Sequence, residues 1–347
     1  MKVKNHYMLP KILRPIAIIG AGGIVKEAHL PAYKKAGFEV KAIFDRDLSK
    51  AKELAEAFNI PKVCANIEEL IEQAEKHQCI YDIALPASAF LSVLSSLPKG
   101  APVLLQKPMG EDITQAKAIL ALCQERNLLA GVNFQLRHAP YIVKAKQLIA
   151  QGLIGQLHDV DVRMNVFTPW ELWEFLFGLP RMEILYHSIH YIDMIRYFLG
   201  NPQRVLAKTT KPPHIKNLSS TRSSIIMDYG AEIRANINTN HGHNFGLKHQ
   251  ESYFKFEGTE GAIKIKIGVY LDYPKGLPDE FEYFSVKEGN CWQKVKINGT
   301  WFPDAFIGPM AGLMCKLENR EYTFINSVED AFHTMELVEE CYLSSGL

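Results

Sequence analysis

Lys107 is the residue whose type and position best suit proton-transfer chemistry. It follows the apolar run Val103–Leu105 and precedes Pro108, whose ring fixes the backbone behind it. A lysine at the carboxyl edge of a sheet can polarise a substrate oxygen or move a proton through its ammonium group. The alternative is a strand-end lysine that extends its ammonium to solvent. The sequence predicts a catalytic and cofactor-contacting role for Lys107.

A second set of chemically able side chains lies in the predicted helix Met182–Leu199. Tyr186, His190 and Asp193 are spaced i, i+4, i+7, so a regular helix places them on one stripe. His190 can take a hydroxyl proton near neutral pH, and a carboxylate one turn along can set its tautomer. Tyr186 can share that work near a lysine ammonium, because the positive charge stabilises a phenolate. The spacing equally allows a hydrogen-bonded interface histidine and a core tyrosine.

A glycine-rich turn near the start of the sequence predicts a dinucleotide site. Ile16–Ile19 is a short apolar run, typical of a strand buried on both faces, and Gly20, Gly22 and Gly23 follow it at once. Glycine lets the backbone turn tightly and approach a pyrophosphate, and the next helix offers its unpaired N–H groups. We expect Ile24 to belong to the same phosphate-binding loop.

The acid after the second predicted strand bears on which dinucleotide binds. Asp45, in F-D-R-D, can accept hydrogen bonds from the adenosine ribose hydroxyls and would repel a 2′-phosphate, which favours NAD. Arg46 can hold that extra phosphate or stack on adenine, so NADP stays open. Both side chains can also be solvated turn residues. Pro86 and Ala87, after the strand Tyr81–Leu85, are expected to pass under the nicotinamide ribose.

Short apolar runs alternate with amphipathic helices over the first part of the chain, which predicts an α/β domain. Buried strands in this alternation form a parallel sheet covered on both sides, and ligands then bind beyond the carboxyl ends of the strands. Asn66 and Glu69 have capping-box spacing. The predicted strands are Ile16–Ile19, Val40–Phe44, Tyr81–Leu85, Val103–Leu105 and Leu129–Phe134. The predicted helices between them are Leu48–Phe58, Ile67–Lys76 and Thr114–Arg126.

Beyond residue 134 the pattern changes to strands in which apolar and polar residues alternate, as in a sheet with one polar face. Helices are predicted at Tyr141–Ala150 and, at the end, over residues 328–343. We therefore predict a Rossmann domain over residues 12–134 and an α+β domain with an open, mostly antiparallel sheet over residues 135–347. The predicted strands of the second sheet are Val160–Val166, Arg204–Thr210, Ser223–Tyr229, Ile233–Thr239, Ser252–Phe256, Ile263–Ile267, Phe281–Val286 and Trp292–Ile297.

Composition excludes several classes of partner. The 347 residues carry 39 Lys and Arg against 38 Asp and Glu, so no basic surplus points to nucleic acid or anionic lipid. The apolar runs are far shorter than a membrane span, and the first fourteen residues lack the apolar core of a secretory signal. The six cysteines form no C-x-x-C pair, which predicts buried thiols in a reducing compartment. We expect a cytoplasmic protein.

Three histidines near the middle of the second domain raise the question of a metal. His241 and His243 form an H-x-H pair that can chelate, and His249 follows. No cysteine or acid nearby completes a ligand set, and the stretch is rich in glycine and asparagine. We expect a strand-connecting loop that borders the substrate pocket or a subunit contact, and no metal site.

Aromatic side chains before the helix Met182–Leu199 can form an apolar wall on one side of the substrate pocket. A plain hydrophobic patch under a loop explains them nearly as well. Besides Lys107, we expect Arg137, Trp170 and Asp193 to contact the substrate. The aromatic residues in question are Trp170, Trp173, Phe175 and Phe177.

The chain resembles the glucose–fructose oxidoreductase/inositol dehydrogenase/MocA (Gfo/Idh/MocA) family over almost its full length. No single motif is decisive, but their order and spacing together are highly specific. The matching segments are Gly20–Tyr33, Phe44–Asp47, Gln106–Pro108, His190–Gly200, Glu257–Gly261 and Ser327–Ser344.

The resemblance implies hydride transfer between a nicotinamide and a hydroxyl carbon of a sugar, polyol or related small molecule. It implies a Rossmann domain followed by an open-faced sheet that binds substrate and often forms the dimer interface, hence a homodimer or homotetramer. The family's E-K-P lysine falls on Lys107 and its helix histidine on His190. We expect Gln106 and Gln135 to contact the cofactor as well.

Four departures from the family pattern leave rival functions open. Gln106 replaces the usual glutamate, Tyr186 stands where many members have aspartate, Phe90 replaces a frequent histidine, and Val25 replaces a small residue. One rival is a glycosidase of the same architecture that holds NAD and cycles it by transient oxidation and elimination. The other is a non-catalytic binder that uses the dinucleotide as a sensor or structural ligand.

Overall fold

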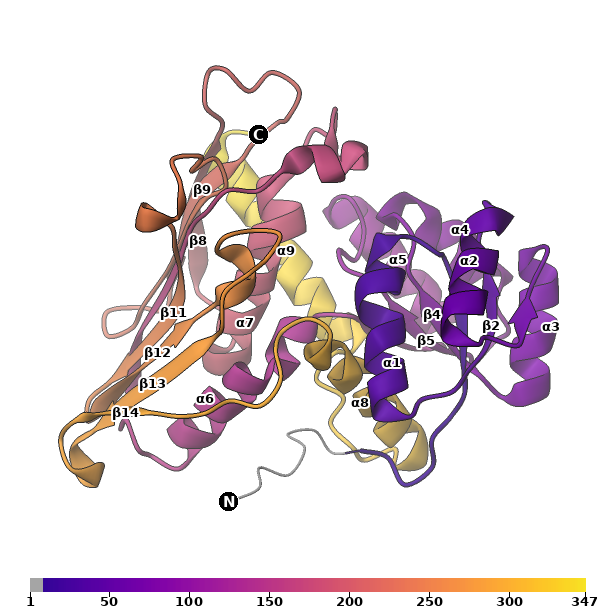
Figure 1. Ribbon diagram of the computed structural model, residues 1–347, viewed down its shortest axis with the longest axis horizontal. Coiled ribbons are helices and arrows are strands. Elements are labelled where there is room, and N and C mark those ends of the chain that lie inside the picture. Colours follow the sequence, from indigo (N-terminus) through magenta and orange to yellow (C-terminus); the bar gives the residue numbers. More distant parts are fainter. Residues whose placement is uncertain (1–8) are drawn as a thin grey trace. The chain divides into compact units, whose positions relative to one another are not determined.

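The structure is a computed structural model that describes residues 9–347 (Figure 1). The chain forms two compact units. The first unit contains the residues up to Ala139 together with Trp301–Met335, and the second contains Pro140–Thr300 and Glu336–Leu347. The chain thus returns to the first unit after the second sheet is complete. The predicted division at residue 134 assigned this late segment to the second domain.

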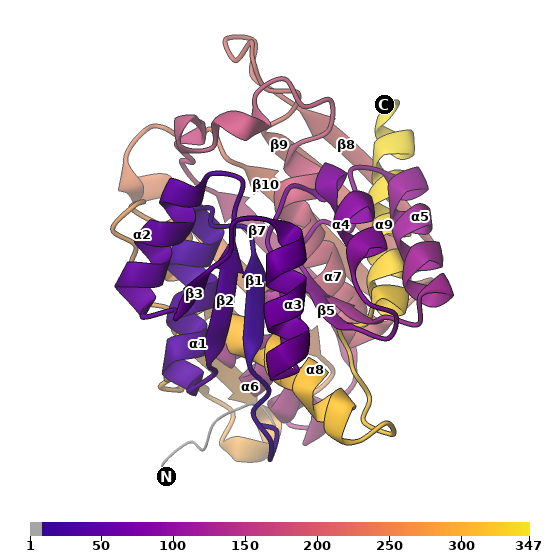
Figure 2. The ribbon, with the colours of Figure 1, turned by 90° about the vertical axis from the view of Figure 1, so that its right-hand side faces the viewer.

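The first unit is built on a six-stranded parallel sheet with the strand order β3-β2-β1-β4-β5-β6. Figure 2 shows β3, β2 and β1 side by side in that order. All four residues of β1 are buried, as in a sheet covered on both faces. The strands are β1 (Ile16–Ile19), β2 (Val40–Phe44), β3 (Lys62–Val63), β4 (Ile80–Ile83), β5 (Pro102–Leu105) and β6 (Leu129–Val132).

Side chains at their N-termini fix where several helices of the first unit begin. Asp47 accepts a hydrogen bond from Ser49 N at 3.0 Å, and Asn66 accepts one from Glu69 N at 2.8 Å. The predicted N-cap Asn66 is therefore confirmed, although Glu69 returns to Ala65 N rather than to the cap residue. The helices are α1 (Leu30–Ala36), α2 (Leu48–Phe58), α3 (Ile67–His77), α4 (Phe90–Ser96), α5 (Ile113–Glu125) and α8 (Ile307–Glu318), with the short turns η1 (Val25–His29), η2 (Ala87–Ala89), η3 (Gln135–His138) and η10 (Asp304–Phe306).

Helices α1, α2 and α8 share one hydrophobic core with the strands of the first sheet. Met310, Leu313 and Met314 of α8 belong to that core, and α8 also packs on β5 and β6. The late segment therefore completes the first unit because its apolar face covers strands that the N-terminal helices leave open.

The second unit is built on an eight-stranded sheet with the order β14-β13-β12-β11-β7-β10-β9-β8. Only the β7–β10 pair among these described strands is parallel, so the sheet is mixed and mostly antiparallel, as predicted. On the central strand β7, the side chains of Val160, Val162 and Met164 lie on the buried face of the sheet. The strands are β7 (Leu157–Asn165), β8 (Arg204–Thr210), β9 (Arg222–Asp228), β10 (Arg234–Asn240), β11 (Glu251–Gly258), β12 (Gly261–Lys266), β13 (Glu280–Ser285) and β14 (Trp292–Lys294).

Helices of the second unit cover one face of this sheet, and Figure 1 shows α6 and α7 along it. The end of α9 protects the edge strand β8, because Ser344 Oγ accepts from Ala207 N at 2.8 Å and Ser345 Oγ accepts from Thr209 N at 3.0 Å. The helices are α6 (Pro140–Ala150), α7 (Ile189–Leu199) and α9 (Val328–Ser345), with the short turns η4 (Trp170–Leu172), η5 (Glu174–Leu176), η6 (Ile184–Ser188), η7 (Leu247–His249), η8 (Gly268–Tyr270) and η9 (Val286–Glu288).

Two composition-based predictions meet the structure at this point. The prediction of buried thiols is wrong for Cys291, which is exposed in the connection between β13 and β14; the other cysteines are buried. No helix among residues 9–347 is long and apolar enough to cross a membrane. The segment considered for a secretory signal lies largely in residues 1–8, outside the described residues.

Candidate functional site

Gly20 ends β1 in a conformation that other residues rarely adopt. Its φ is +111°, and a Cβ there would lie 2.4 Å from the carbonyl oxygen of Ala84. Gly20 N donates to Phe44 O at 2.8 Å, which joins the turn to the end of β2. The fold itself therefore requires glycine at this position.

Gly22 and Gly23 differ from Gly20 in both backbone conformation and surroundings. Both are exposed, neither has a positive φ, and a Cβ on either would meet nothing within 4 Å. Packing within the chain does not require glycine at these two positions. Their missing side chains instead leave the surface of the loop open at the N-terminus of the first helix, where a pyrophosphate needs close backbone approach. The predicted loop residues, including the half-buried Ile24, fit a dinucleotide.

Asp45 is held at the carboxyl end of β2, beside this loop. Its Oδ2 accepts from Ala21 N at 2.6 Å and its Oδ1 accepts from Asp47 N at 2.8 Å. The two hydrogen bonds orient the carboxylate next to the phosphate loop, where ribose recognition needs it. Arg46 is exposed. Pro86, also exposed, starts the short turn after β4 that contains the buried Ala87.

Lys107 lies directly after β5, at the same carboxyl edge of the sheet as the glycine loop. Its side chain is half-buried, and burial lowers its pKa to about 8. A lysine with this pKa can both hold and release a proton near neutral pH, which an ordinary surface lysine does not do.

Gln106, before Lys107, begins a buried polar network that the sequence analysis missed. Its Oε1 accepts from Asn133 Nδ2 at 3.1 Å, and the same nitrogen lies 3.3 Å from His29 Nε2. His29 Nδ1 lies 2.7 Å from Asp82 Oδ2. The sequence did contain a signal, since Asp82 interrupts the otherwise apolar strand β4 and a buried strand rarely carries an unpaired carboxylate.

Gln135 and Arg137 lie in the turn after β6, and both are almost completely buried. Arg137 pairs with Asp330 at 2.6 Å and donates to Ile325 O at 2.6 Å. These partners tie the late segment of the first unit to η3. These contacts support a structural role for Arg137, and its contact with substrate stays a prediction.

In the second unit, the prediction of one regular helix over Met182–Leu199 is wrong in its first turns. Residues Ile184–Ser188 form a π-helix, and α7 begins only at Ile189. A π turn is wider than an α turn, so the rotation between successive side chains changes just before His190. Tyr186 is half-buried and His190 is 6% exposed, whereas Asp193 is fully buried.

The aromatic segment before this helix divides into buried and exposed parts. Trp170 is 6% exposed and packs in a small hydrophobic core with Leu176, whereas Phe175 is 57% exposed and Phe177 38% exposed. Trp173 packs against the same core. Trp170 and Trp173 thus belong to a hydrophobic cluster and Phe175 and Phe177 do not, and a pocket wall stays a prediction.

His241 lies in the connection from β10 to β11, as expected, and its side chain belongs to a buried polar group. Its Nδ1 lies 2.9 Å from Thr168 Oγ1, and its Nε2 lies 3.4 Å from a carboxylate oxygen of Glu183. The Trp170 and His187 rings lie 5.3 and 4.7 Å from its ring. Burial alone would raise the pKa of Glu183, but His241 and hydrogen-bonding hydroxyls outweigh burial and lower it.

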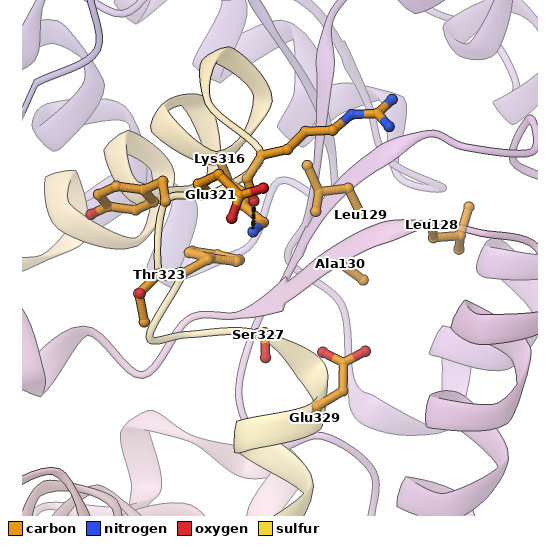
Figure 3. Close-up of a pocket in the computed structure, with 11 residues that line it drawn as sticks. Leu128, Leu129, Ala130, Lys316, Glu321, Thr323, Ser327 and Glu329 are labelled. Atoms are coloured by element: carbon orange, nitrogen blue, oxygen red, sulfur yellow. Dashed lines mark hydrogen bonds between the residues drawn. The ribbon is translucent and has the colours of Figure 1, made fainter.

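A hollow of about 440 Å³ in the first unit lies elsewhere, between β6 and the connection from α8 to α9. Figure 3 shows Lys316 and Glu321 on one side of it and Ser327 and Glu329 on the other. None of the predicted site residues lines it. Gly20, Asp45 and Lys107 follow the carboxyl ends of β1, β2 and β5, so the hollow is separate from these candidate residues.

Comparison with protein families matches residues 14–134 to the description "Oxidoreductase family, NAD-binding Rossmann fold" and residues 146–346 to "Oxidoreductase family, C-terminal alpha/beta domain". The chain belongs to the Gfo/Idh/MocA oxidoreductase family. The resemblance inferred from the sequence motifs and the predicted fold class are thereby confirmed.

Individual relatives agree with this membership of the Gfo/Idh/MocA family. An uncharacterized protein of Saccharomyces cerevisiae is 32% identical over 265 residues, which cover 73% of this chain and 74% of that protein. D-xylose 1-dehydrogenase (NADP(+)) 2 of Haloferax volcanii is 24% identical over 261 residues, 74% of this chain and 76% of that enzyme. An oxidoreductase from Agrobacterium radiobacter, solved with NAD+, L-tartaric acid and magnesium, shares the fold with a TM-score of 0.79 at 19% identity, over 96% of this chain and 97% of that one.

Proposed function

We propose that this family member transfers a hydride between a nicotinamide dinucleotide and a hydroxyl carbon of a sugar, polyol or related small molecule. The observation that carries the proposal is Lys107, a half-buried lysine with a pKa lowered to about 8, at the carboxyl edge that also holds the open glycine loop. The name of the Haloferax volcanii relative, a xylose dehydrogenase, supports a carbohydrate substrate.

Lys107 has the central role in this proposal. A bound nicotinamide would supply the hydride acceptor at its C4. The Lys107 ammonium donates a hydrogen bond to the substrate oxygen and stabilises negative charge on it as the hydroxyl proton leaves. We further propose His190 as the proton acceptor from the second unit, with Tyr186 sharing the proton.

We propose NAD over NADP as the preferred dinucleotide because Asp45 is fixed beside the phosphate loop by two backbone hydrogen bonds. A 2′-phosphate on the ribose would face this carboxylate. Arg46 is the residue that could offset the repulsion. The relatives include both an NADP(+) enzyme and a structure with NAD+, so the preference has to be measured on this chain.

Assembly and location follow from the same account. Leu206 and Ile226 pair across β8 and β9, and they are 48% and 51% exposed. We propose that this face of the second sheet joins copies of the chain into a homodimer or homotetramer. We also propose that the protein works in the cytoplasm, where its buried thiols stay reduced. Light scattering on a Leu206→Glu variant tests the assembly, which should fall to a monomer.

The deciding experiment has two steps. First, NADH and NADPH are titrated onto the protein by nicotinamide fluorescence, with Asp45→Ala and Arg46→Ala as companions. Second, a panel of sugars and polyols is added with the oxidised dinucleotide, and absorbance of the reduced nicotinamide is followed. Reduction by at least one panel member supports the proposal.

Two other outcomes of that experiment identify the rival functions. Release of sugar from a glycoside without net NADH would point to the glycosidase. Tight dinucleotide binding with no redox change across the whole panel would point to a sensor.

A further inference from the structure

Five buried polar side chains form one continuous chain through the first unit, from helix α1 to the residue after β5. The Tyr33 hydroxyl donates to Asp82 Oδ2 at 2.8 Å, and His29 Nδ1 lies 2.7 Å from the same oxygen. Asn133 Nδ2 lies 3.3 Å from His29 Nε2 and 3.1 Å from Gln106 Oε1. The members are at most 8% exposed: Tyr33, Asp82, His29, Asn133 and Gln106.

The donors and acceptors in this chain fix the direction of every hydrogen bond. An ionised carboxylate only accepts, so His29 Nδ1 must carry a hydrogen to bond to Asp82. The Asn133 amide nitrogen only donates, so His29 Nε2 and Gln106 Oε1 must both accept from it. His29 is then a neutral imidazole with its hydrogen on Nδ1. Asp82 therefore accepts from both Tyr33 and His29, and Asn133 donates to both His29 and Gln106.

The direction of the Asn133–Gln106 hydrogen bond determines which end of the Gln106 carboxamide is available to a ligand. Asn133 holds Oε1 inward, so Nε2, with its two hydrogens, is the end directed away from Asn133. Gln106 immediately precedes Lys107 at the carboxyl edge of the sheet, where ligands of parallel sheets bind. A glutamate at this position would offer only acceptors, whereas this glutamine offers a donor.

We propose that Asp82, His29 and Asn133 are positioning residues that fix the orientation of the Gln106 carboxamide, so that it donates a hydrogen bond to an acceptor oxygen of the nicotinamide nucleoside beside Lys107. The inference rests on the proposed function. It also explains why a histidine and an aspartate are buried in a core that apolar residues would otherwise fill. Buried polar groups are costly unless they are hydrogen-bonded, and each side chain of this network bonds to at least one other member.

Asp82, His29, Asn133 and Gln106 are called the relay below. Two substitutions distinguish a positioning role of the relay from a role in packing alone. Asn133→Asp replaces the donor between His29 and Gln106 by an acceptor, which forces Gln106 to donate inward and turn its oxygen to the ligand. Gln106→Glu keeps the acceptor that Asn133 needs but removes the donor to the ligand. Because a lost hydrogen bond to a ligand costs about 1–1.5 kcal/mol, each variant should bind NADH roughly five- to tenfold more weakly. The matched control is the same asparagine-to-aspartate change at Asn66, the N-cap residue of α3 in the same unit. Asn66→Asp should bind NADH as the wild type does.

The relay itself is read directly from the ring nitrogens by two-dimensional ¹H–¹⁵N NMR of the histidines, with His29 assigned from a His29→Gln spectrum. At neutral pH the wild type should show His29 neutral with hydrogen on Nδ1, and Asn133→Asp should show both ring nitrogens protonated. A wild-type His29 that is charged, or that carries its hydrogen on Nε2, would overturn the proposal. Normal NADH affinity in Gln106→Glu would overturn it as well.

These readouts are independent of turnover, so the two proposals can fail separately. Histidine signals and NADH affinities as expected, without redox activity on any substrate, would refute the proposed function alone. Turnover in the wild type together with unchanged NADH affinity in both variants would refute the relay alone. If Asn133→Asp does not fold, Gln106→Glu decides the question, because it preserves every hydrogen bond inside the relay.

Discussion

The imidazole of His29 and the carboxylate of Asp82 lie 2.7 Å apart, Nδ1 to Oδ2, and both side chains are completely buried. Asp82 stands on β4, in the middle of the parallel sheet, and His29 ends the π turn that precedes α1. The hydrogen bonds that start from this pair end at Gln106, next to Lys107.

The first prediction concerns the stability that this pair contributes. Asp82→Leu leaves the His29 N–H and the Tyr33 O–H buried without an acceptor, so it should destabilise the protein by about 2–4 kcal/mol. Asp82→Asn retains an acceptor oxygen and loses only the charge assistance, about 1 kcal/mol. Urea unfolding followed by circular dichroism measures both. Equal losses in the two variants would show that the carboxylate's hydrogen bonds do not matter.

The second prediction separates the two kinds of glycine in the loop. Gly20→Ala introduces strain at φ +111° and a clash with Ala84 O, so it should cost about 2–4 kcal/mol of folding free energy. Gly22→Val adds a Cβ that meets no protein atom within 4 Å and should leave stability within about 0.5 kcal/mol. Gly22→Val should nonetheless weaken NADH binding by at least about tenfold, because the pyrophosphate loses close backbone approach. A Gly22→Val variant with normal affinity would place the dinucleotide elsewhere.

The third prediction follows from the pKa of Lys107, which burial lowers to about 8. If the ammonium is the active form, kcat/KM should fall as the pH rises through about 8. Gln106→Glu places a carboxylate beside the ammonium and favours its charged form, so the alkaline limb should move up by about 1 unit or more. Asn66→Asp adds the same charge far from Lys107 and should leave the limb unchanged. An unshifted limb in Gln106→Glu would mean that another group titrates there.

The fourth prediction concerns Glu183 in the second unit. The pKa of this buried glutamate is lowered from its usual 4.5, so its charged form stabilises the fold above that pH and the contribution is lost as pH falls through the lower folded value. Glu183→Gln should therefore be about 1–3 kcal/mol less stable at pH 7, with a difference that shrinks in acid. Denaturant midpoints at several pH values measure this. The exposed Glu171→Gln is the control, and a pH-independent difference would contradict the prediction.

Much of the first unit could be predicted because local pattern and tertiary burial agree there. The strands Ile16–Ile19 and Val40–Phe44 and the helix Leu48–Phe58 occur with the predicted bounds. The two-residue strand β3 was missed, since so short a segment carries no periodicity. The short helix α4 was missed as well, because Phe90–Ser96 spans fewer than two and a half turns.

The positions of the candidate site residues after strands were predictable, and the residues packed behind them were not. The glycine loop, Asp45 and Lys107 have recognisable types after predicted strands, whereas the partners of Gln106 come from three separate elements. Periodicity assumes 3.6 residues per turn, so the π turn Ile184–Ser188 and its effect on Tyr186 were out of reach. Distant pairs such as Arg137 with Asp330 exist only once the chain returns to the first unit.

The measurement that tests the account most directly is turnover and dinucleotide affinity of Lys107→Met, beside the exposed-lysine control Lys117→Met. With any substrate that reduces the nicotinamide, Lys107→Met should lower kcat by at least about a hundredfold while NADH affinity stays within about threefold. Lys117→Met should behave as the wild type. Undiminished kcat in Lys107→Met would contradict the account, because the reaction would then proceed without the group on which it depends.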